Sequence, residues 1–332
     1  MTEKILEVKN LKTYFHTFKG VVKAVDGVDF SLEKGKTLGI VGESGGGKSV
    51  TGFSLIKLIE EPGEIVEGEI LFYGEDLMKK SEREMGKIRG KEISMIFQDP
   101  MTSLNPLFTI KRQMDEVLKI HTNLNEKERL NRSVELLRSV GIPNPEDRIK
   151  SYPHELSGGM RQRVIIATSM SANPKLIIAD EPTTALDVTI QAQILRLLKE
   201  LVQKNNNSLI LITHDLAVVS EMADNIIVMY CGKIVEQGKT KQIVNNSYHP
   251  YTRGLLNSIP RFRSDKSRLD TIEGIVPNMF NLPKGCNFAP RCKYKQERCE
   301  NEEPLKREIT EGHYAACHFP LKGLANGGNQ ND

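Results

Sequence analysis

A glycine-rich segment that ends in lysine and serine carries the most recognisable chemistry in this chain. Residues 42–49 read Gly-Glu-Ser-Gly-Gly-Gly-Lys-Ser, the pattern G-x-x-x-x-G-K-S. An apolar run precedes them at 37–41, and a run of helical character follows at 50–60. Glycines let successive backbone N–H groups turn toward a phosphate, and the N-terminus of the next helix attracts the same anion. The pattern and its strand–loop–helix context therefore predict a phosphate-binding P-loop.

Each part of this P-loop has a predicted task. Lys48 is suited to reach the β- and γ-phosphates of a nucleotide, and the Ser49 hydroxyl is suited to ligate Mg²⁺. A Gly-rich turn with a chance lysine is the alternative, which the flanking strand and helix patterns disfavour. The residues expected to contact the nucleotide or its metal are Gly42, Ser44, Gly45, Gly46, Gly47, Lys48 and Ser49.

Two acidic residues follow a second apolar run, at 176–179. Asp180 at the end of a strand can hold Mg²⁺ through water, and Glu181 is then placed to orient or deprotonate an attacking water. A solvated acidic turn is the alternative interpretation. The P-loop upstream favours a hydrolytic role for the pair.

Residues 156–162 read Leu-Ser-Gly-Gly-Met-Arg-Gln and resemble the LSGGQ signature of the ATP-binding-cassette (ABC) transporter ATPases, with Met160 in place of the usual glutamine. Ser157, Gly158 and Gly159 open a helix, so that free N–H groups and a hydroxyl can face a phosphate. The resemblance implies that this loop binds the γ-phosphate of ATP held by another subunit's P-loop. Two cassettes would then enclose two nucleotides.

The resemblance covers residues 3–240 and extends to three further motifs. Gln98 is similar to the Q-loop glutamine, which contacts Mg²⁺ and responds to the transmembrane partner. Asp187, in Ala-Leu-Asp at 185–187, is similar to the D-loop that crosses the dimer. His214 is similar to the switch histidine that contacts the γ-phosphate. The implied catalytic residues are Glu181, His214 and Lys48.

An aromatic residue ahead of the P-loop stacks on adenine in this family. Phe15 fits the family's spacing best, and Tyr14 is a close rival. Either side chain is equally suited to the core, so both alternatives stay open.

The local patterns predict an α/β fold. Short β-like runs within 3–35 and at 65–73 favour an antiparallel sheet, and helical periodicity dominates about 100–170. Continuous apolar runs at 176–179, 208–213 and 225–230 are typical of parallel strands covered on both faces. We therefore expect a P-loop NTPase core of the ABC ATPase type with an antiparallel β subdomain, a helical insert and a small cysteine-rich C-terminal extension. The expected parts are a nucleotide-binding domain at 1–245, the extension at 246–322 and a disordered tail at 323–332.

Two segments indicate a subfamily. Residues 246–256 resemble the extension of oligopeptide, dipeptide and nickel importer ATPases, and 97–106 resemble that subfamily's Q-loop region, closest to its D-type ATPase subunit. The resemblance implies hydrolysis of ATP to power import of di- or oligopeptides. It also implies as partners an F-type ATPase subunit, two transmembrane permease subunits and an extracytoplasmic peptide-binding protein.

Four late cysteines have the spacing C-x₅-C-x₆-C-x₁₇-C. In a reducing cytosol such a cluster favours metal over disulfides. Four thiolates suit a [4Fe–4S] cluster, and subfamily members with the same tail look like iron–sulfur proteins. Zinc is the alternative, with His313 or His318 able to replace a cysteine, and unliganded thiols are the third possibility. The expected cluster ligands are Cys286, Cys292, Cys299 and Cys317.

Composition restricts the remaining alternatives. The 332 residues include 46 basic and 43 acidic ones, a near-balance that argues against a nucleic-acid partner. No apolar run approaches the roughly 20 residues that span a bilayer, and the N-terminus lacks the apolar segment of a signal peptide. We expect a peripheral protein at the cytoplasmic face of the membrane.

Three other functions are alternatives to peptide import. They are an importer of nickel or another small solute, a soluble ABC ATPase of translation or repair, and a purely structural nucleotide-binding module. The presence of one cassette without a coiled coil disfavours the second, and intact Glu181 and His214 disfavour the third.

Overall fold

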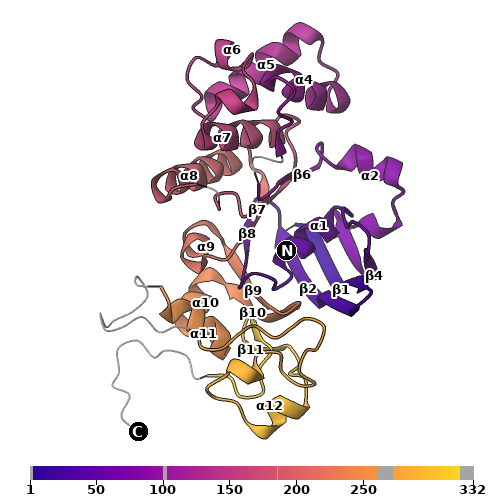
Figure 1. Ribbon diagram of the computed structural model, residues 1–332, viewed down its shortest axis with the longest axis vertical. Helices are drawn as coiled ribbons and strands as arrows, with labels where there is room; N and C mark the ends of the chain where they lie inside the picture. The colour runs from indigo at the N-terminus through magenta and orange to yellow at the C-terminus, as the bar shows by residue number, and fades with distance from the viewer. Residues whose placement is uncertain (1–2, 100–102, 185, 260–271, 322–332) are drawn as a thin grey trace. The chain divides into compact units, whose positions relative to one another are not determined.

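The computed structural model describes residues 3–99, 103–184, 186–259 and 272–321. The chain divides into two compact units, each built from segments that are distant in sequence (Figure 1). The first unit comprises residues 1–5, 32–36 and 72–212, and the second comprises 6–31, 37–71 and 213–332. The predicted disordered tail at 323–332 lies outside the described residues.

The first unit contains three parallel strands in the order β8-β7-β6. Their bounds are β6 (Ile93–Ile96), β7 (Leu176–Asp180) and β8 (Ser208–Thr213). Ile178 of β7 pairs with Met95 on one side and Ile210 on the other. Every residue of the three strands is buried, which explains their uninterrupted apolar sequences and confirms the strands predicted here.

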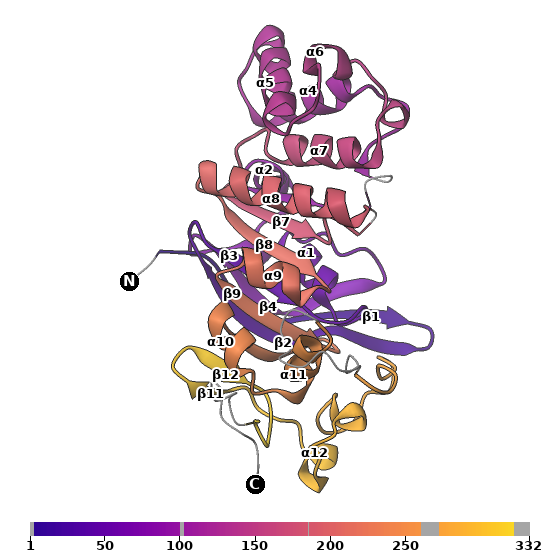
Figure 2. The same ribbon diagram turned by 90° about the vertical axis from the view of Figure 1, so that its left-hand side faces the viewer.

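A group of helices makes up much of the rest of this unit. Figures 1 and 2 both show α4, α5, α6 and α7 gathered together. α5 begins at a capping box: Asn125 Oδ1 accepts the Glu128 N–H at 3.0 Å, and the Glu128 carboxylate accepts the Asn125 N–H at 2.7 Å. The helical character predicted for about 100–170 is confirmed in its described part. The helices are α4 (Ile110–His121), α5 (Glu126–Ser139), α6 (Pro145–Arg148) and α7 (Gly158–Ser169).

Shorter elements and one long helix complete the first unit. They are β5 (Glu75–Asp76), η1 (Leu77–Lys79), α2 (Glu82–Ile88), η2 (Pro153–Glu155) and α8 (Val188–Lys204).

The second unit holds the strand order β2-β1-β4, with β1 (Lys4–Thr17), β2 (Gly20–Glu33) and β4 (Gly63–Phe72). β1 and β2 are adjacent and joined by two residues, so they run antiparallel, as predicted. The runs 21–25 and 28–32, which look separate in the sequence, form one continuous strand. Gly27 takes a φ of 77° within that strand, a left-handed conformation that glycine adopts at little cost.

The same unit has a second set of strands in the order β11-β12-β10-β9-β3. β3 (Thr37–Val41) runs parallel to β9 (Asn225–Tyr230), and β9 runs antiparallel to β10 (Lys233–Lys239). β12 (His313–Ala315) pairs with β10 and with β11 (Arg307–Thr310). The C-terminal segment, residues 272–321, therefore adds β11 and β12 to the set of hydrogen-bonded strands that includes β3, the strand before the P-loop.

The helices of the second unit are short. The P-loop helix α1 ends at Leu55, five positions before the predicted end, because Lys57 adopts a left-handed conformation with φ 52°. There the Leu58 N–H donates to Phe53 O at 2.9 Å, which closes the helix. The helices are α1 (Lys48–Leu55), α9 (Leu216–Met222), α10 (Thr240–Asn246), α11 (Pro250–Asn257), η4 (Ala289–Arg291) and α12 (Glu297–Asn301).

Candidate functional site

The P-loop connects β3 to α1 and depends on two glycines that no other residue can replace without strain. Gly42 and Gly47 have φ values of 154° and 93°. A Cβ added to Gly47 would lie 2.2 Å from the carbonyl oxygen of Ala24, and one added to Gly42 would lie 2.2 Å from that of Met229. Backbone oxygens cannot move aside as a flexible side chain can, so the loop can follow this path only with glycine at both positions.

Hydrogen bonds within the chain support this shape of the loop. The carbonyl oxygen of Glu43 accepts the Gly46 N–H at 3.2 Å and the Lys48 Nζ at 3.0 Å. The Gly46 carbonyl accepts the Gly232 N–H at 3.0 Å. Lys48 is 4% exposed, and Ser49 is half-buried at the start of α1. A preformed loop of this kind can bind a polyphosphate with little reorganisation.

The other predicted nucleotide contacts of the second unit are the aromatic pair and the histidine. Tyr14 donates its O–H to Asp26 Oδ1 at 2.6 Å, and Lys23 Nζ lies 5.5 Å from the centroid of its ring. The Phe15 ring lies so close to Gly63 that an added Cβ there would be 2.7 Å from it. Both aromatics are half-buried, and His214 is exposed directly after β8. Which aromatic stacks on adenine stays a prediction.

In the first unit, the two predicted acids end β7 as expected. Asp180 is 1% exposed and Glu181 is 8% exposed, with a φ of 43° at Glu181. The Glu181 N–H donates to Ile212 O at 2.8 Å, which ties this turn to β8. A left-handed conformation at a residue other than glycine is strained, and the neighbouring contacts must hold it in place.

Side chains of Gln98 and Thr184 hold the Glu181 carboxylate. Its Oε2 accepts a hydrogen bond from Gln98 Nε2 at 3.3 Å and one from Thr184 Oγ1 at 2.7 Å. The structure thus brings together Gln98 and Glu181, which lie 83 positions apart. The contact of Thr184 with Glu181 was not predicted from the sequence, although a hydroxyl three residues after an acid is a recurrent local hydrogen-bonding pattern.

The signature loop lies at the N-terminus of α7. The Ser157 Oγ accepts the Met160 N–H at 3.3 Å, so Ser157 is the N-cap, and Gly158 and Gly159 form the first turn. A Cβ on Gly159 would lie 2.9 Å from Ile190 Cγ2 of α8. Asp187 caps α8 by accepting the Ile190 N–H at 3.0 Å. Ile190 at the start of α8 therefore lies next to Gly159 of the signature and also bonds to Asp187, while Ala185 lies outside the described residues.

The predicted iron–sulfur centre is wrong. Across residues 3–99, 103–184, 186–259 and 272–321, no group of three or more His, Cys, Asp or Glu side chains is placed to hold a metal ion. The predicted [4Fe–4S] ligands, which are also those of the zinc alternative, line a small cavity of about 20 Å³ and are all free thiols: Cys286, Cys292, Cys299 and Cys317.

Burial gives a physical reason for this correction. It raises the pKa of Cys286 to about 11 and that of Cys317 to about 12, so both side chains are neutral thiols near pH 7. The histidines proposed as replacements have other partners. His313 Nε2 lies 2.8 Å from the buried carboxylate of Glu236, and His318 Nε2 lies 2.9 Å from Glu302 O.

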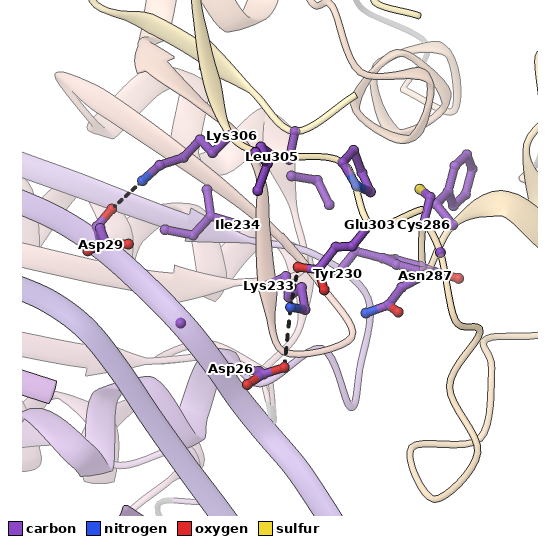
Figure 3. Close-up of a pocket in the computed structure, with 16 residues that line it drawn as sticks. Asp26, Asp29, Tyr230, Lys233, Ile234, Cys286, Asn287, Glu303, Leu305 and Lys306 are labelled. Carbon is purple, nitrogen blue, oxygen red and sulfur yellow. Dashed lines mark hydrogen bonds and ion pairs between the residues drawn. The ribbon is translucent and has the colours of Figure 1, made fainter. Parts of the chain in front are cut away.

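A larger cavity of about 230 Å³ lies between β2, β10 and the C-terminal segment (Figure 3). Figure 3 shows Lys233 between Asp26 and Glu303. The Lys233 Nζ lies 3.2 Å from Asp26 Oδ2 and 2.5 Å from Glu303 Oε1. Lys306 Nζ donates to the backbone oxygen of Asp29 at 2.9 Å. Lys233 and Lys306 thus connect the C-terminal segment to β2. Asp26, which accepts the hydrogen bond from Tyr14, lies on the same strand.

Comparison with known proteins gives matches along the chain. Residues 25–184 match the family described as ABC transporter, and 235–299 match that described as oligopeptide/dipeptide transporter, C-terminal region. The chain is 53% identical over 314 residues to the oligopeptide transport ATP-binding protein AppD of Bacillus subtilis, covering 94% of this chain and 96% of AppD. It is 49% identical over 317 residues to the dipeptide transport ATP-binding protein DppD of Escherichia coli, covering 96% of this chain and 97% of DppD.

A solved structure supports the same relationship. The ATP-binding cassette MJ0796, a dimer in a post-hydrolysis state bound to ADP and Pi, superimposes with a TM-score of 0.64 at 28% identity. The match covers 71% of this chain and 98% of that one. Among the helices that the structure describes, none is both long enough and apolar enough to cross a membrane.

Proposed function

The chain belongs to the family of oligopeptide and dipeptide transport ATP-binding proteins of ABC transporters, and from this premise we propose that it hydrolyses ATP to power the import of di- or oligopeptides. The observation that carries the proposal is the 53% identity to AppD over 94% of the chain. The match of residues 235–299 to the peptide transporter C-terminal region favours peptides over other solutes. The same match supports a functional role for the C-terminal extension.

The P-loop residues fit a nucleoside triphosphate. We assign the phosphates to the backbone N–H groups of the P-loop and to Lys48, and adenine to Phe15 or Tyr14. Oxygen groups of Ser49, Gln98 and Asp180 suit Mg²⁺, which when bound neutralises charge on the β- and γ-phosphates.

Hydrolysis needs a base for the attacking water and a contact to the γ-phosphate that is transferred to it, while ADP leaves. Glu181 takes the proton of the attacking water, because its buried carboxylate is held in one orientation by Gln98 and Thr184. His214 contacts the γ-phosphate. Positioning and charge neutralisation, rather than covalent catalysis, then account for the rate.

The signature loop serves a second subunit in this proposal. Ser157, Gly158 and Gly159 offer a hydroxyl and helix N-terminal N–H groups to the γ-phosphate held by a partner ATPase of the F type, and Asp187 lies at the same interface. ATP binding closes the two cassettes, and hydrolysis reopens them because the closed form binds ATP better than ADP.

The membrane partners are two permease subunits, which receive peptide from an extracytoplasmic binding protein. A broad groove in the first unit is suited to a permease helix, since its lining includes the exposed apolar residues Leu107 and Ile120, at 77% and 68%. This docking places the chain at the cytoplasmic face of the membrane.

Two variants separate the two phosphate-binding loops. Lys48→Ala should abolish ATP binding by the isolated chain, whereas Ser157→Arg should keep it. In the complete transporter both variants should lose peptide-stimulated phosphate release. Lys150→Ala, at an exposed surface site, is the matched control and should behave as wild type.

Uptake of radiolabelled dipeptide by cells tests the physiological role. Cells that carry Lys48→Ala as their only copy should lose uptake. Unchanged peptide uptake, or recovery of the protein from membranes with ribosomes instead of permease subunits, would refute the proposal. Loss of nickel uptake with peptide uptake intact would refute the peptide assignment.

A further inference from the structure

The second residue of the P-loop is held by the C-terminal segment. Arg291 Nη1 and Nη2 donate to the two carboxylate oxygens of Glu43 at 2.5 and 3.0 Å. The Arg291 side chain is 4% exposed and that of Glu43 is 31% exposed. Two parallel hydrogen bonds between charged groups in a largely buried place form a strong and directional contact. It joins residues 248 positions apart.

A second contact fixes the main chain of the same residue. The Glu43 N–H donates to the hydroxyl oxygen of Tyr251 at 2.8 Å, and Tyr251 is fully buried in α11. Both the side chain and the backbone of Glu43 therefore depend on residues that follow the nucleotide-binding motifs in the sequence.

Arg291 is itself held in position. Its Nε donates to Glu273 O at 3.1 Å and its Nη2 to Ile272 O at 3.2 Å. The guanidinium carbon also lies 5.9 Å from the ring centroid of Tyr230 and 6.0 Å from that of Phe288. A guanidinium with this many partners keeps one orientation, so little freedom is lost when it acts on Glu43.

Glu43 connects this contact to the phosphate-binding lysine. Its carbonyl oxygen accepts hydrogen bonds from Lys48 Nζ and from the Gly46 N–H. A shift of Glu43 would therefore change the position of both groups. Moreover, an unpaired carboxylate within the P-loop would repel a triphosphate, and the positive charge of Arg291 offsets that repulsion.

We propose that Arg291 is a positioning residue for nucleotide binding, which holds the P-loop in its phosphate-binding shape and neutralises Glu43. This inference rests on the proposed function, because it concerns the same ATP site. It gives the C-terminal segment a direct task in ATP binding.

The test measures the Kd of full-length protein for a fluorescent ATP analogue with Mg²⁺, alongside thermal unfolding without nucleotide. Arg291→Gln should raise the Kd about tenfold, which corresponds to about 1.4 kcal/mol. Arg291→Lys keeps the charge without the paired bonds and should give a smaller increase. Lys293→Gln, which changes an exposed cation two positions away, is the control and should leave the Kd unchanged.

A double variant tests the route through Glu43. Because Glu43→Gln removes the unpaired carboxylate, Glu43→Gln with Arg291→Gln should bind more tightly than Arg291→Gln alone. In the assembled transporter, Arg291→Gln should raise the KM for ATP and leave kcat within about twofold, a split that general loss of stability would not produce.

The outcomes separate this inference from the proposed function. If wild-type protein binds ATP, Lys48→Ala does not, and Arg291→Gln binds like wild type, the positioning role is overturned while the function stands. Additive losses in the double variant would also overturn it. If Arg291→Gln does not fold, the Kd of Arg291→Lys is measured instead, and a wild-type Kd for that variant would overturn the positioning role. Failure of wild-type protein to bind ATP at all would instead overturn the function.

Discussion

The side-chain amide of Gln98 donates a hydrogen bond to the carboxylate of Glu181 at 3.3 Å, and the same oxygen accepts the Thr184 hydroxyl at 2.7 Å. The carboxylate that we assign as general base is therefore connected to the residue that we assign to Mg²⁺ and to the permease signal. A change at Gln98 would remove one of the hydrogen bonds that hold this carboxylate. This contact offers a short physical route from permease docking to hydrolysis.

Glu181→Gln should reduce ATP hydrolysis by the complete transporter by about 10²–10⁴-fold, because the amide cannot take a proton from water. ATP binding should persist, since Lys48 and the P-loop are intact. Steady-state phosphate release and the Kd for ATP measure the two effects. Glu200→Gln, on the exposed face of α8, is a control that should hydrolyse normally. Hydrolysis by Glu181→Gln at the wild-type rate would remove Glu181 from the mechanism.

Two P-loop glycines with similar backbone conformations should respond differently to alanine. Gly45 has a φ of 77° and open space around an added Cβ, so Gly45→Ala should cost about 1 kcal/mol of stability for the left-handed backbone alone. Gly47 has a φ of 93°, and its added Cβ would meet Ala24 O at 2.2 Å. Gly47→Ala should therefore cost at least about 2 kcal/mol and abolish ATP binding.

Urea unfolding without nucleotide measures the free energy of unfolding of both variants. Because no nucleotide is bound in this experiment, altered contacts to its phosphates do not contribute to the difference. Equal losses of unfolding free energy for the two variants would show that the close approach to Ala24 does not constrain the loop.

Features with a local physical cause were predictable from the sequence. The strands at 176–179 and 208–213 are buried on both faces, so their apolar runs were sufficient to identify them. The Asn125–Glu128 capping box requires only residues three positions apart. The continuous strand through Gly27 was not predictable, because a left-handed glycine also fits a turn.

The features that could not be predicted from the sequence depend on burial and on pairing between distant residues. The spacing of four cysteines carries no information on burial, which raises the pKa of Cys292 as well as those of Cys286 and Cys317. The pairing of Glu43 with Arg291 joins residues 248 positions apart, and no local pattern marks it. The site around Glu181 was predicted in part. Glu181 was identified from the apolar strand before it, whereas its hydrogen bond with Thr184 was seen only in the structure.

The groove assigned to the permease should be sensitive to a charge. Leu107→Glu places a carboxylate on an apolar side chain that is 77% exposed, so the fold and the ATP Kd of the isolated chain should not change. Recovery of permease subunits in affinity purification from membranes should fall about tenfold or more. Leu305→Glu, at an apolar residue that is 82% exposed in the other unit, is the matched control. Equal recovery with Leu107→Glu and wild type would exclude this groove as the docking site.

His249 should make the protein less stable in mild acid. Burial lowers the pKa of this fully buried histidine from 6.5 to about 4, although the charge of Glu236 opposes the change. As the pH falls from 6.5 to 4, the unfolded chain gains a proton that the folded chain does not take up, so unfolding becomes more favourable. The pKa difference corresponds to a loss of about 3 kcal/mol at pH 4, of which about 2 kcal/mol is lost between pH 7 and 5.

The His249→Asn variant isolates this contribution, because other groups also titrate in the same range. The His249 Nδ1 accepts the Tyr251 N–H at 3.1 Å as the N-cap of α11, and asparagine can provide the same acceptor without a charge change. Urea unfolding at pH 7 and pH 5 should therefore show a smaller loss of stability for His249→Asn than for wild type, by about 2 kcal/mol. The exposed His154→Asn variant should follow the wild-type profile. Parallel pH profiles for wild type and His249→Asn would mean that His249 takes up its proton equally in the folded and unfolded chains.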